Sequence, residues 1–180
     1  IEKTGDKDIL FEKIEYLDSN PLEENEHSRY EIPKIYEIKE TLYEHIKKAI
    51  NLSVKINAEN NLPNIGSGDW SDGLNNLFGQ SVWLAFFLYD ILNKFIGYMK
   101  DDSDLEIYKE KIEQLKIGIK NSWDGKWYKR AFTKDGICIG SSINDECKID
   151  SLPQAWSVIS NFEDKEKNKY ILRYKESKYE

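Results

Sequence analysis

The residue types best suited to chemistry lie together in one glycine-rich segment, residues 66–75, which has the sequence GSGDWSDGLN. Asp69 and Asp72 can transfer a proton or bind a hydroxyl group, and Trp70 offers a flat apolar face for a sugar ring. The glycines let the backbone adopt unusual conformations and let a ligand approach closely. The alternative is a loop whose acidic side chains only cap the following helix, and composition alone leaves the two interpretations equally open.

The other candidate polar residues each have a simpler structural interpretation. Arg130 and Lys126 could face a sugar or a phosphate, although partial exposure to solvent is the favoured interpretation. His45 lies on a predicted amphipathic helix without a metal partner, so we expect a local hydrogen bond rather than a catalytic base. The acidic pair Asp145 and Glu146 is interpreted as loop structure.

Two helices are predicted to flank residues 66–75, which we call the acid loop. The first, residues 39–57, contains the capping box Thr41-x-x-Glu44 and then places apolar residues at helical spacing. The second, residues 80–98, is apolar on nearly every face, which in a soluble protein indicates a helix buried on most sides. The acid loop would therefore connect an amphipathic helix to a core helix.

A third helix and a small hairpin are predicted to follow. The capping box Ser103-x-x-Glu106 precedes a narrow apolar stripe, which indicates an outer, half-solvated helix. Residues 126–140 then alternate around Asp135-Gly136, which is a strong signal for a β-hairpin.

The two ends of the chain show weaker patterns. No sustained period is found at the start, whereas Ser151 followed by Pro153 resembles an N-cap and the first turn of a last helix. Buried and amphipathic helices joined by long loops are what two concentric helical layers require, so an all-α domain is predicted. We assign residues 1–37 to an irregular lead-in and residues 38–122 to a helical part with the acid loop. Residues 123–150 are assigned to a hairpin with its loop, and residues 151–180 to a helical end.

Composition excludes several classes of function. The 180 residues carry a net charge of -7, and 33% of them are charged, so a nucleic-acid partner is not expected. No apolar run approaches the roughly 18 to 20 residues that span a bilayer, and a soluble, cytoplasmic protein is expected. Cys138 and Cys147 lack metal or redox spacing and are expected to be reduced packing residues.

Ordered blocks run through nearly the whole chain: PLE at 21–23, TLYEH at 41–45, GSGDWSDG at 66–73, QSVWL at 80–84, WDGKWYKRAF at 123–132, NDECKIDS at 144–151 and QAWSVIS at 154–160. Together they resemble glycoside hydrolase family 94. This family comprises cellobiose, chitobiose and oligoglucan phosphorylases and the related module of cyclic β-1,2-glucan synthases. The acid loop is most similar to the β-1,2-glucan branch.

The resemblance implies part of an (α/α)6 barrel, an incomplete toroid, that performs inverting phosphorolysis or glucosyl transfer on β-linked glucosides. Phosphate, the co-substrate, would attack the anomeric carbon and give α-glucose 1-phosphate, so one catalytic carboxyl group suffices. Asp72 matches the general acid, Trp70 the tryptophan of the glucose site, and Asp69 a loop organiser or hydroxyl acceptor. Arg130 is kept as a third substrate-binding candidate. The implied partners are a β-glucooligosaccharide and phosphate, with no metal or organic cofactor and with a homodimer as one assembly.

Departures from the family pattern limit what this chain is expected to do alone. Ser71 stands where Asn is usual, Gln80 stands where Glu is usual, and the connection at residues 76–79 is short. The family's upstream glucose-binding residues and downstream phosphate-binding residues have no counterpart here. We therefore expect an internal fragment of a catalytic barrel, inactive in isolation.

Such a fragment is also expected to expose interior helix faces, at Phe86, Phe87 and Leu88. Two alternatives to an active enzyme segment stay open. One is a truncated remnant with at most β-glucan binding, and the other is a structural helical module that tolerates replacement of Asp72 by Asn.

Overall fold

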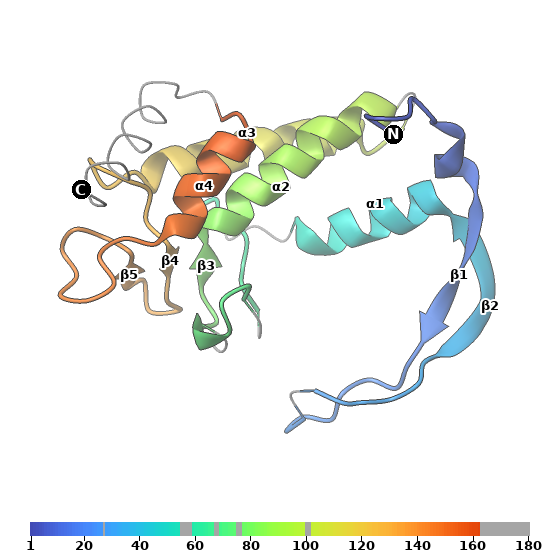
Figure 1. The fold of residues 1–180 in the computed structure, drawn as a ribbon, viewed down its shortest axis with the longest axis horizontal. Helices are drawn as coiled ribbons and strands as arrows, with labels where there is room; N and C mark the ends of the chain where they lie inside the picture. Colours follow the sequence, from blue (N-terminus) through green and yellow to red (C-terminus); the bar gives the residue numbers. More distant parts are fainter. Residues whose placement is uncertain (27, 55–58, 67–68, 75–76, 100–101, 163–180) are drawn as a thin grey trace. The chain divides into compact units, whose positions relative to one another are not determined.

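The computed structural model describes residues 1–26, 28–54, 59–66, 69–74, 77–99 and 102–162 (Figure 1). Contacts divide the chain into two compact units, Ile1–Leu52 and Ser53–Glu180. None of the helices in the described part of the chain has the length and apolar character needed to cross a membrane.

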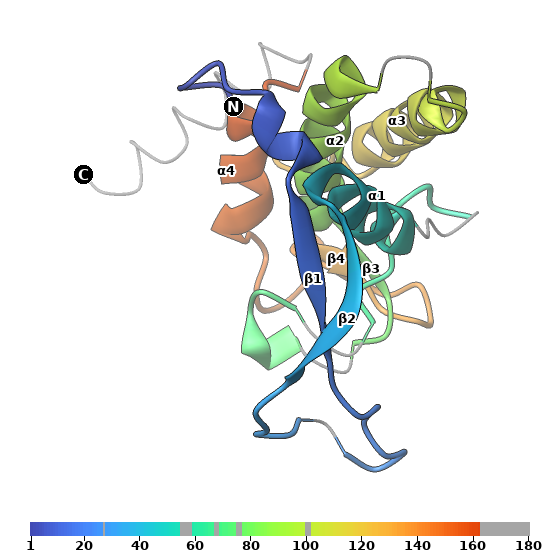
Figure 2. The ribbon, with the colours of Figure 1, turned by 90° about the vertical axis from the view of Figure 1, so that its right-hand side faces the viewer.

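The first unit is a two-stranded antiparallel sheet followed by a helix (Figures 1 and 2). Its elements, in chain order, are η1 (Asp8–Phe11), β1 (Lys13–Asp18), β2 (Lys34–Thr41) and α1 (Leu42–Ser53). The prediction of an irregular lead-in over residues 1–37 is therefore wrong. Most side chains of both strands are exposed, so neither strand carries the alternating apolar pattern of a half-buried strand.

The first helix is shorter than predicted. It begins at Leu42 because the chain up to Thr41 pairs in β2, and residues 55–57 of the predicted helix lie outside the described part. The Thr41 Oγ1 atom accepts a hydrogen bond from the Glu44 N–H at 3.2 Å. That bond confirms the Thr41 half of the predicted capping box.

The second unit is built around one central helix, α2. Its elements are η2 (Asp72–Leu74), β3 (Gln80–Ser81), α2 (Val82–Phe95), η3 (Ile96–Tyr98), α3 (Leu105–Asn121), β4 (Ala131–Phe132), β5 (Cys138–Ile139) and α4 (Ser151–Ile159). Helices α3 and α4 both pack against α2 (Figures 1 and 2). Phe86 and Leu88 are only 0% and 3% exposed, whereas Phe87 is half-buried. The predicted core helix is thus confirmed, and the expected exposure of Phe86 and Leu88 is wrong because this chain supplies their cover.

Both later helices follow an Asp rather than the predicted Ser. Helix α4 is capped by Asp150, whose Oδ1 accepts a hydrogen bond from the Leu152 N–H at 2.7 Å, so Ser151 is the first helical residue. Helix α3 follows Asp104, one residue beyond Ser103. In each case an Asp adjacent to the predicted Ser takes the cap position, for which Asp and Ser are about equally favoured.

A three-stranded antiparallel sheet, in the order β3-β4-β5, completes the second unit. The predicted hairpin near residues 126–140 is confirmed, with Gly136 at a φ of 78° in its turn. Strand β3 has only two residues, too few to show any period. Across its described part the chain forms four α-helices and two small antiparallel sheets, so the all-α prediction is corrected to that extent. The last helix ends at Ile159, and residues 163–180 of the predicted helical end lie outside the described part.

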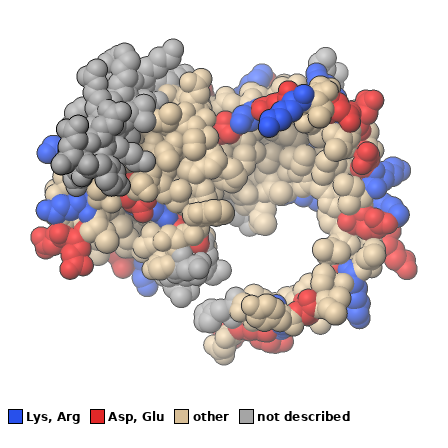
Figure 3. All heavy atoms as spheres, in the orientation of Figure 1, with Lys and Arg blue, Asp and Glu red and all other residues tan. Residues whose placement is uncertain are grey.

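Charged side chains of both signs are interspersed on the face shown in Figure 3. Ion pairs one helical turn apart include Lys94 with Asp90 at 2.8 Å and Lys109 with Glu106 at 2.7 Å. Exposed pairs of this kind contribute little to stability, so the fold depends on its apolar core.

Candidate active site

The acid loop is closed at its neck by backbone hydrogen bonds. The Ile65 N–H donates to the Gly79 oxygen at 2.9 Å, and the Ser81 N–H donates to the Pro63 oxygen at 3.0 Å. Because the two ends of the segment are joined, the loop leaves and re-enters the fold at one place, the edge of β3. Residues 67–68 and 75–76 of the loop lie outside the described part.

Asp69 is the first described acid of the loop, and its side chain is only 2% exposed. Its Oδ1 atom accepts hydrogen bonds from the Arg130 guanidinium and from the Ser71 N–H, the latter at 2.8 Å. Its Oδ2 atom accepts a hydrogen bond from the Trp83 indole N–H at 3.2 Å. A buried carboxylate requires such partners, and here both oxygens have them.

Arg130 joins the loop to two helix starts. Its Nη2 atom contacts Asp69, its Nε atom donates to Asp150 Oδ2 at 3.2 Å, and its Nη1 atom donates to Ser81 Oγ at 3.4 Å. Asp150 caps α4 and Ser81 caps α2. The Arg130 side chain is 1% exposed, so the interpretation that it is partly solvated is wrong.

Trp70 is 78% exposed beside these buried groups. Its ring meets the Trp83 ring edge to face, with centroids 6.3 Å apart. Trp83 in turn packs against Phe87 and Trp156, at 5.9 Å and 6.2 Å between ring centroids. The acid loop therefore presents an accessible aromatic face supported by other aromatic rings. Trp83 and Trp127 are buried, whereas Trp156 is half-buried.

Asp72 lies three residues after Asp69, at the first position of the short helix η2. The turn around it is closed by the Leu74 N–H, which donates to the Ser71 oxygen at 2.8 Å. The Asp72 side chain lies outside what the structure describes.

The helix that follows the acid loop is capped by a residue outside the loop. Helix α2 is capped by Ser81, whose Oγ atom accepts a hydrogen bond from the Leu84 N–H at 3.3 Å. The alternative of a loop that only caps α2 is therefore not what the structure shows. The described contacts of the loop reach α2 through Trp83 and the cap of α4 through Arg130, the residue before β4.

The remaining candidates have structural roles. The Nε2 atom of His45 is 3.1 Å from the Ile14 carbonyl oxygen, and its ring stacks on Tyr16 at 3.9 Å, which confirms a local hydrogen-bonding residue. Lys126 is exposed, and so are the loop residues Asp145 and Glu146.

The two cysteines are not joined in a disulfide bond. Both are free thiols, as predicted. Cys138 is half-buried, whereas Cys147 is exposed, so the expected packing role does not apply to Cys147. Among the residues that the structure describes, no group of three or more His, Cys, Asp or Glu side chains is arranged to hold a metal ion.

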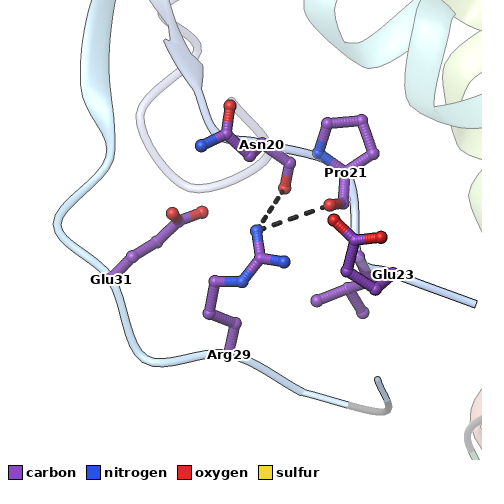
Figure 4. A pocket seen from close by; sticks show the side chains of 6 residues that line it. Asn20, Pro21, Glu23, Arg29 and Glu31 are labelled. Atoms are coloured by element: carbon purple, nitrogen blue, oxygen red, sulfur yellow. Dashed lines mark hydrogen bonds between the residues drawn. The ribbon is translucent and has the colours of Figure 1, made fainter. Parts of the chain in front are cut away.

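A separate hollow lies in the connection between β1 and β2 (Figure 4). Its Arg29 side chain donates to the backbone oxygens of Asn20 and Pro21 at 3.3 Å and 3.4 Å, and it also pairs with Glu26. These contacts hold the two arms of the connection together. Arg29 is thus occupied by the chain itself.

Comparison with known proteins identifies the family. Residues 1–179 match the family model "Glycosyl hydrolase 94 superfamily, catalytic domain". The chain belongs to the glycosyl hydrolase 94 family. The matched region includes the acid loop, its neck and Arg130.

Relatives within the family act in different ways. The chain is 36% identical over 173 residues to cyclic beta-(1,2)-glucan synthase NdvB of Rhizobium meliloti, which covers 92% of this chain and 6% of that protein. It is 28% identical over 187 residues to solabiose phosphorylase of Paenibacillus borealis, covering 99% and 22%. It is 27% identical over 138 residues to N,N'-diacetylchitobiose phosphorylase of Vibrio proteolyticus, covering 73% and 17%. The chain spans less than a quarter of the length of each of these relatives.

The sequence predicts Asp72 as the candidate acid, but it does not predict the link between the loop and the helix starts. Arg130 meets partners that lie 61, 49 and 20 residues away along the chain. The spacing of apolar residues within one segment cannot predict contacts between residues so far apart in the chain. Tyr128, Arg130 and Ala131 are all buried, so the segment before β4 offers no clear alternation that would have marked Arg130.

Proposed function

We propose that this chain is the part of a glycosyl hydrolase 94 catalytic domain that carries the general acid, Asp72, for phosphorolysis or glucosyl transfer on β-linked glucosides. The observation that carries the proposal is the engagement of Asp69. Both of its oxygens accept hydrogen bonds, and one of the donors is a fully buried guanidinium. Asp69 is thus committed to the interior as one of the two carboxylates that pair with Arg130. The role of proton donor within the loop then falls to Asp72.

The proposed reaction inverts the anomeric carbon. The Asp72 carboxyl group gives its proton to the glycosidic oxygen as the bond between that oxygen and the anomeric carbon breaks. A phosphate oxygen attacks the same carbon from the opposite face, and α-glucose 1-phosphate and a shortened saccharide are released. Phosphate brings its own nucleophilic oxygen, so no second carboxylate is needed to activate a water.

Trp70 is proposed as the sugar contact beside this acid. Its exposed ring is supported by Trp83, and a fixed aromatic face stacks on a pyranose ring without further ordering. For Asp69 and Arg130, the other two substrate-binding candidates, the described contacts favour support of the loop over direct contact with sugar. Similarity to the glucan synthase of Rhizobium meliloti supports a β-1,2-glucan as the substrate. The family assignment supports an (α/α)6 barrel as the complete domain.

The test is release of glucose 1-phosphate from β-1,2-glucooligosaccharides or cellobiose with inorganic phosphate. It is run on the 180-residue chain and on the full polypeptide encoded by the reading frame that contains it. Asp72→Asn should lower release from the active form by roughly 10²–10⁴-fold, the usual contribution of a positioned acid. Asp135→Asn is the matched control, because Asp135 is exposed in the hairpin turn and Asn-Gly suits such a turn equally well.

The outcomes separate the alternatives. Full activity in Asp72→Asn would refute the assignment of the acid. Binding of β-glucan with no product from either polypeptide would instead support a binding remnant. With phosphate withheld and a glucan acceptor supplied, transfer to the acceptor would identify the glucosyl-transfer form of the reaction.

A further inference from the structure

We propose that Arg130 is the positioning residue of the acid loop. It fixes Asp69 against the starts of α2 and α4, and through Asp69 it holds the backbone that carries Asp72. The inference rests on the proposed role of Asp72 and adds a residue that acts through another, without contact to the sugar.

The path from Arg130 to Asp72 is short and continuous. Arg130 binds Asp69 Oδ1, and the same oxygen accepts the Ser71 N–H at 2.8 Å, one residue before Asp72. The Ser71 oxygen then accepts the Leu74 N–H at 2.8 Å, which closes the turn that contains Asp72. Movement of the Asp69 carboxylate would therefore move the backbone of this turn.

The other end of the path is rigid. The Arg130 N–H donates to the Ile139 oxygen at 2.8 Å, and the Arg130 oxygen accepts the Val82 N–H at 3.1 Å. Gly140, with a φ of 78°, lies so close that a Cβ there would be 2.8 Å from the Arg130 backbone nitrogen. The guanidinium thus extends from a backbone held on both sides by β5 and by the start of α2.

Arginine is the residue type that this junction requires. Its planar group donates in several fixed directions, so it can bind Asp69 and Asp150 at once and still reach Ser81. A lysine ammonium keeps the charge but lacks the fork that spans two carboxylates. With 1% of its side chain exposed, Arg130 has almost no surface left for a ligand.

A displaced acid should impair proton donation more than sugar binding. An alkoxide leaving group needs the proton, whereas the phenoxide of an activated aryl β-glucoside, such as the 2,4-dinitrophenyl compound, leaves without it. A positioning defect therefore predicts a selective loss on the saccharide substrate. A general folding defect would lower both reactions equally.

The experiment compares Arg130→Lys with Arg29→Lys in the full polypeptide. Arg29→Lys is the matched control, because it makes the same change at the hollow between β1 and β2. Arg130→Lys should lower kcat for phosphorolysis of the saccharide by about 10²-fold with little change in KM, because an acid misplaced by about 1 Å loses that much. The aryl glucoside rate should fall less than about tenfold, and Arg29→Lys should match wild type. A rise in KM with kcat unchanged would make Arg130 a substrate-binding residue and overturn the proposal, as would equal loss on both substrates.

Two further measurements keep the test decisive. If Arg130→Lys does not fold, Asp150→Asn takes its place in the test. This variant retains an oxygen to cap α4 and removes the charge that faces Arg130 Nε, so it should give the same substrate pattern in a milder form. Amide hydrogen exchange needs no activity. In Arg130→Lys or Asp150→Asn, exchange at residues 69–74 should accelerate relative to the α3 amides, and unchanged protection would overturn the inference. A wild-type protein without product would refute the proposed function, while the exchange result would still decide whether Arg130 holds the loop.

Discussion

Replacement of Gly79 by Ala should displace the acid loop while leaving the helical core intact. Gly79 lies at the loop's neck, where its oxygen accepts the Ile65 N–H. A Cβ atom at this position would lie 1.8 Å from the Phe132 carbonyl oxygen and 2.8 Å from the carbonyl carbons of Phe132 and Thr133. All three atoms belong to the backbone of β4 or its end, so no side-chain rotation can relieve the contact.

The size of the displacement follows from these distances. Cβ atoms essentially never approach other heavy atoms within 3.0 Å, so Gly79 and β4 must separate by more than about 1 Å. Overpacking of this kind typically destabilises a protein by about 1 to 3 kcal/mol. A shift of about 1 Å at a catalytic group can also cost about 10²-fold in rate, so activity should fall more steeply than stability.

Thermal unfolding and glucose 1-phosphate release should be measured for Gly79→Ala beside Gly97→Ala. Gly97 lies in η3, where an added Cβ would have nothing within 4 Å and the φ is not positive. The same chemical change should therefore be close to neutral there. If the two variants match in both Tm and rate, the neck does not position the loop and the reasoning is wrong.

Three further predictions concern stability. Gly118→Ala should destabilise the protein by about 1 kcal/mol or more in urea unfolding, because the Cβ would lie 2.3 Å from a backbone oxygen and this outweighs the helix propensity of Ala; a stabilised variant would contradict this. Phe86→Ala should cost about 3 to 5 kcal/mol, since the ring is 0% exposed and packs edge to face on two other rings, and a loss below about 1 kcal/mol would show that the core collapses around the gap. Burial tends to raise the pKa of Asp124, but hydrogen bonds from Ser142 and Ser141 outweigh it and the pKa is lowered overall. A lowered pKa gives stability that is present above the unfolded value of 3.8 and is lost as the pH falls through the folded value. Asp124→Asn should therefore lower Tm at pH 7, and the deficit should shrink as the pH falls below 3.8; a deficit that does not change with pH would contradict the assignment.

The helices could be predicted because each has a local signal. Residues 82–95 are apolar on nearly all sides, and a helix with no polar face has to be a core helix. The cap of α4 was wrong by one residue, because Asp and Ser are nearly equal as N-caps and only the backbone conformation decides between neighbours such as Asp150 and Ser151. Helix α3 follows Asp104, whose side chain makes no cap hydrogen bond.

The strands could not be predicted in the same way. Strands β1 and β2 pair with each other and leave most of their side chains in solvent, so they lack the buried face that gives a half-buried strand a sustained alternation. Strand β3 exists because the neck of the acid loop meets β4, a contact between residues about 50 positions apart. In both cases the strands are joined by hydrogen bonds between backbone groups. Because every sequence has these groups, the residue types alone do not indicate the pairing.

Arg130 illustrates how a buried charge can be recognised before its partners are known. Tyr128 and Arg130 are two residues apart in the segment that leads into β4, both are buried, and Tyr128 belongs to an aromatic block. An arginine on an inward face can be buried only if carboxylates meet it there. The acids available in the matched blocks include Asp69 and Asp150, which are the two that bind it. A solvent-facing role for Arg130 was favoured because side-chain type was considered without the aromatic block that precedes it. Had that block been taken as buried, the same residues would have pointed to an internal support for the acid loop, and the sugar contact would have been assigned to Trp70 alone.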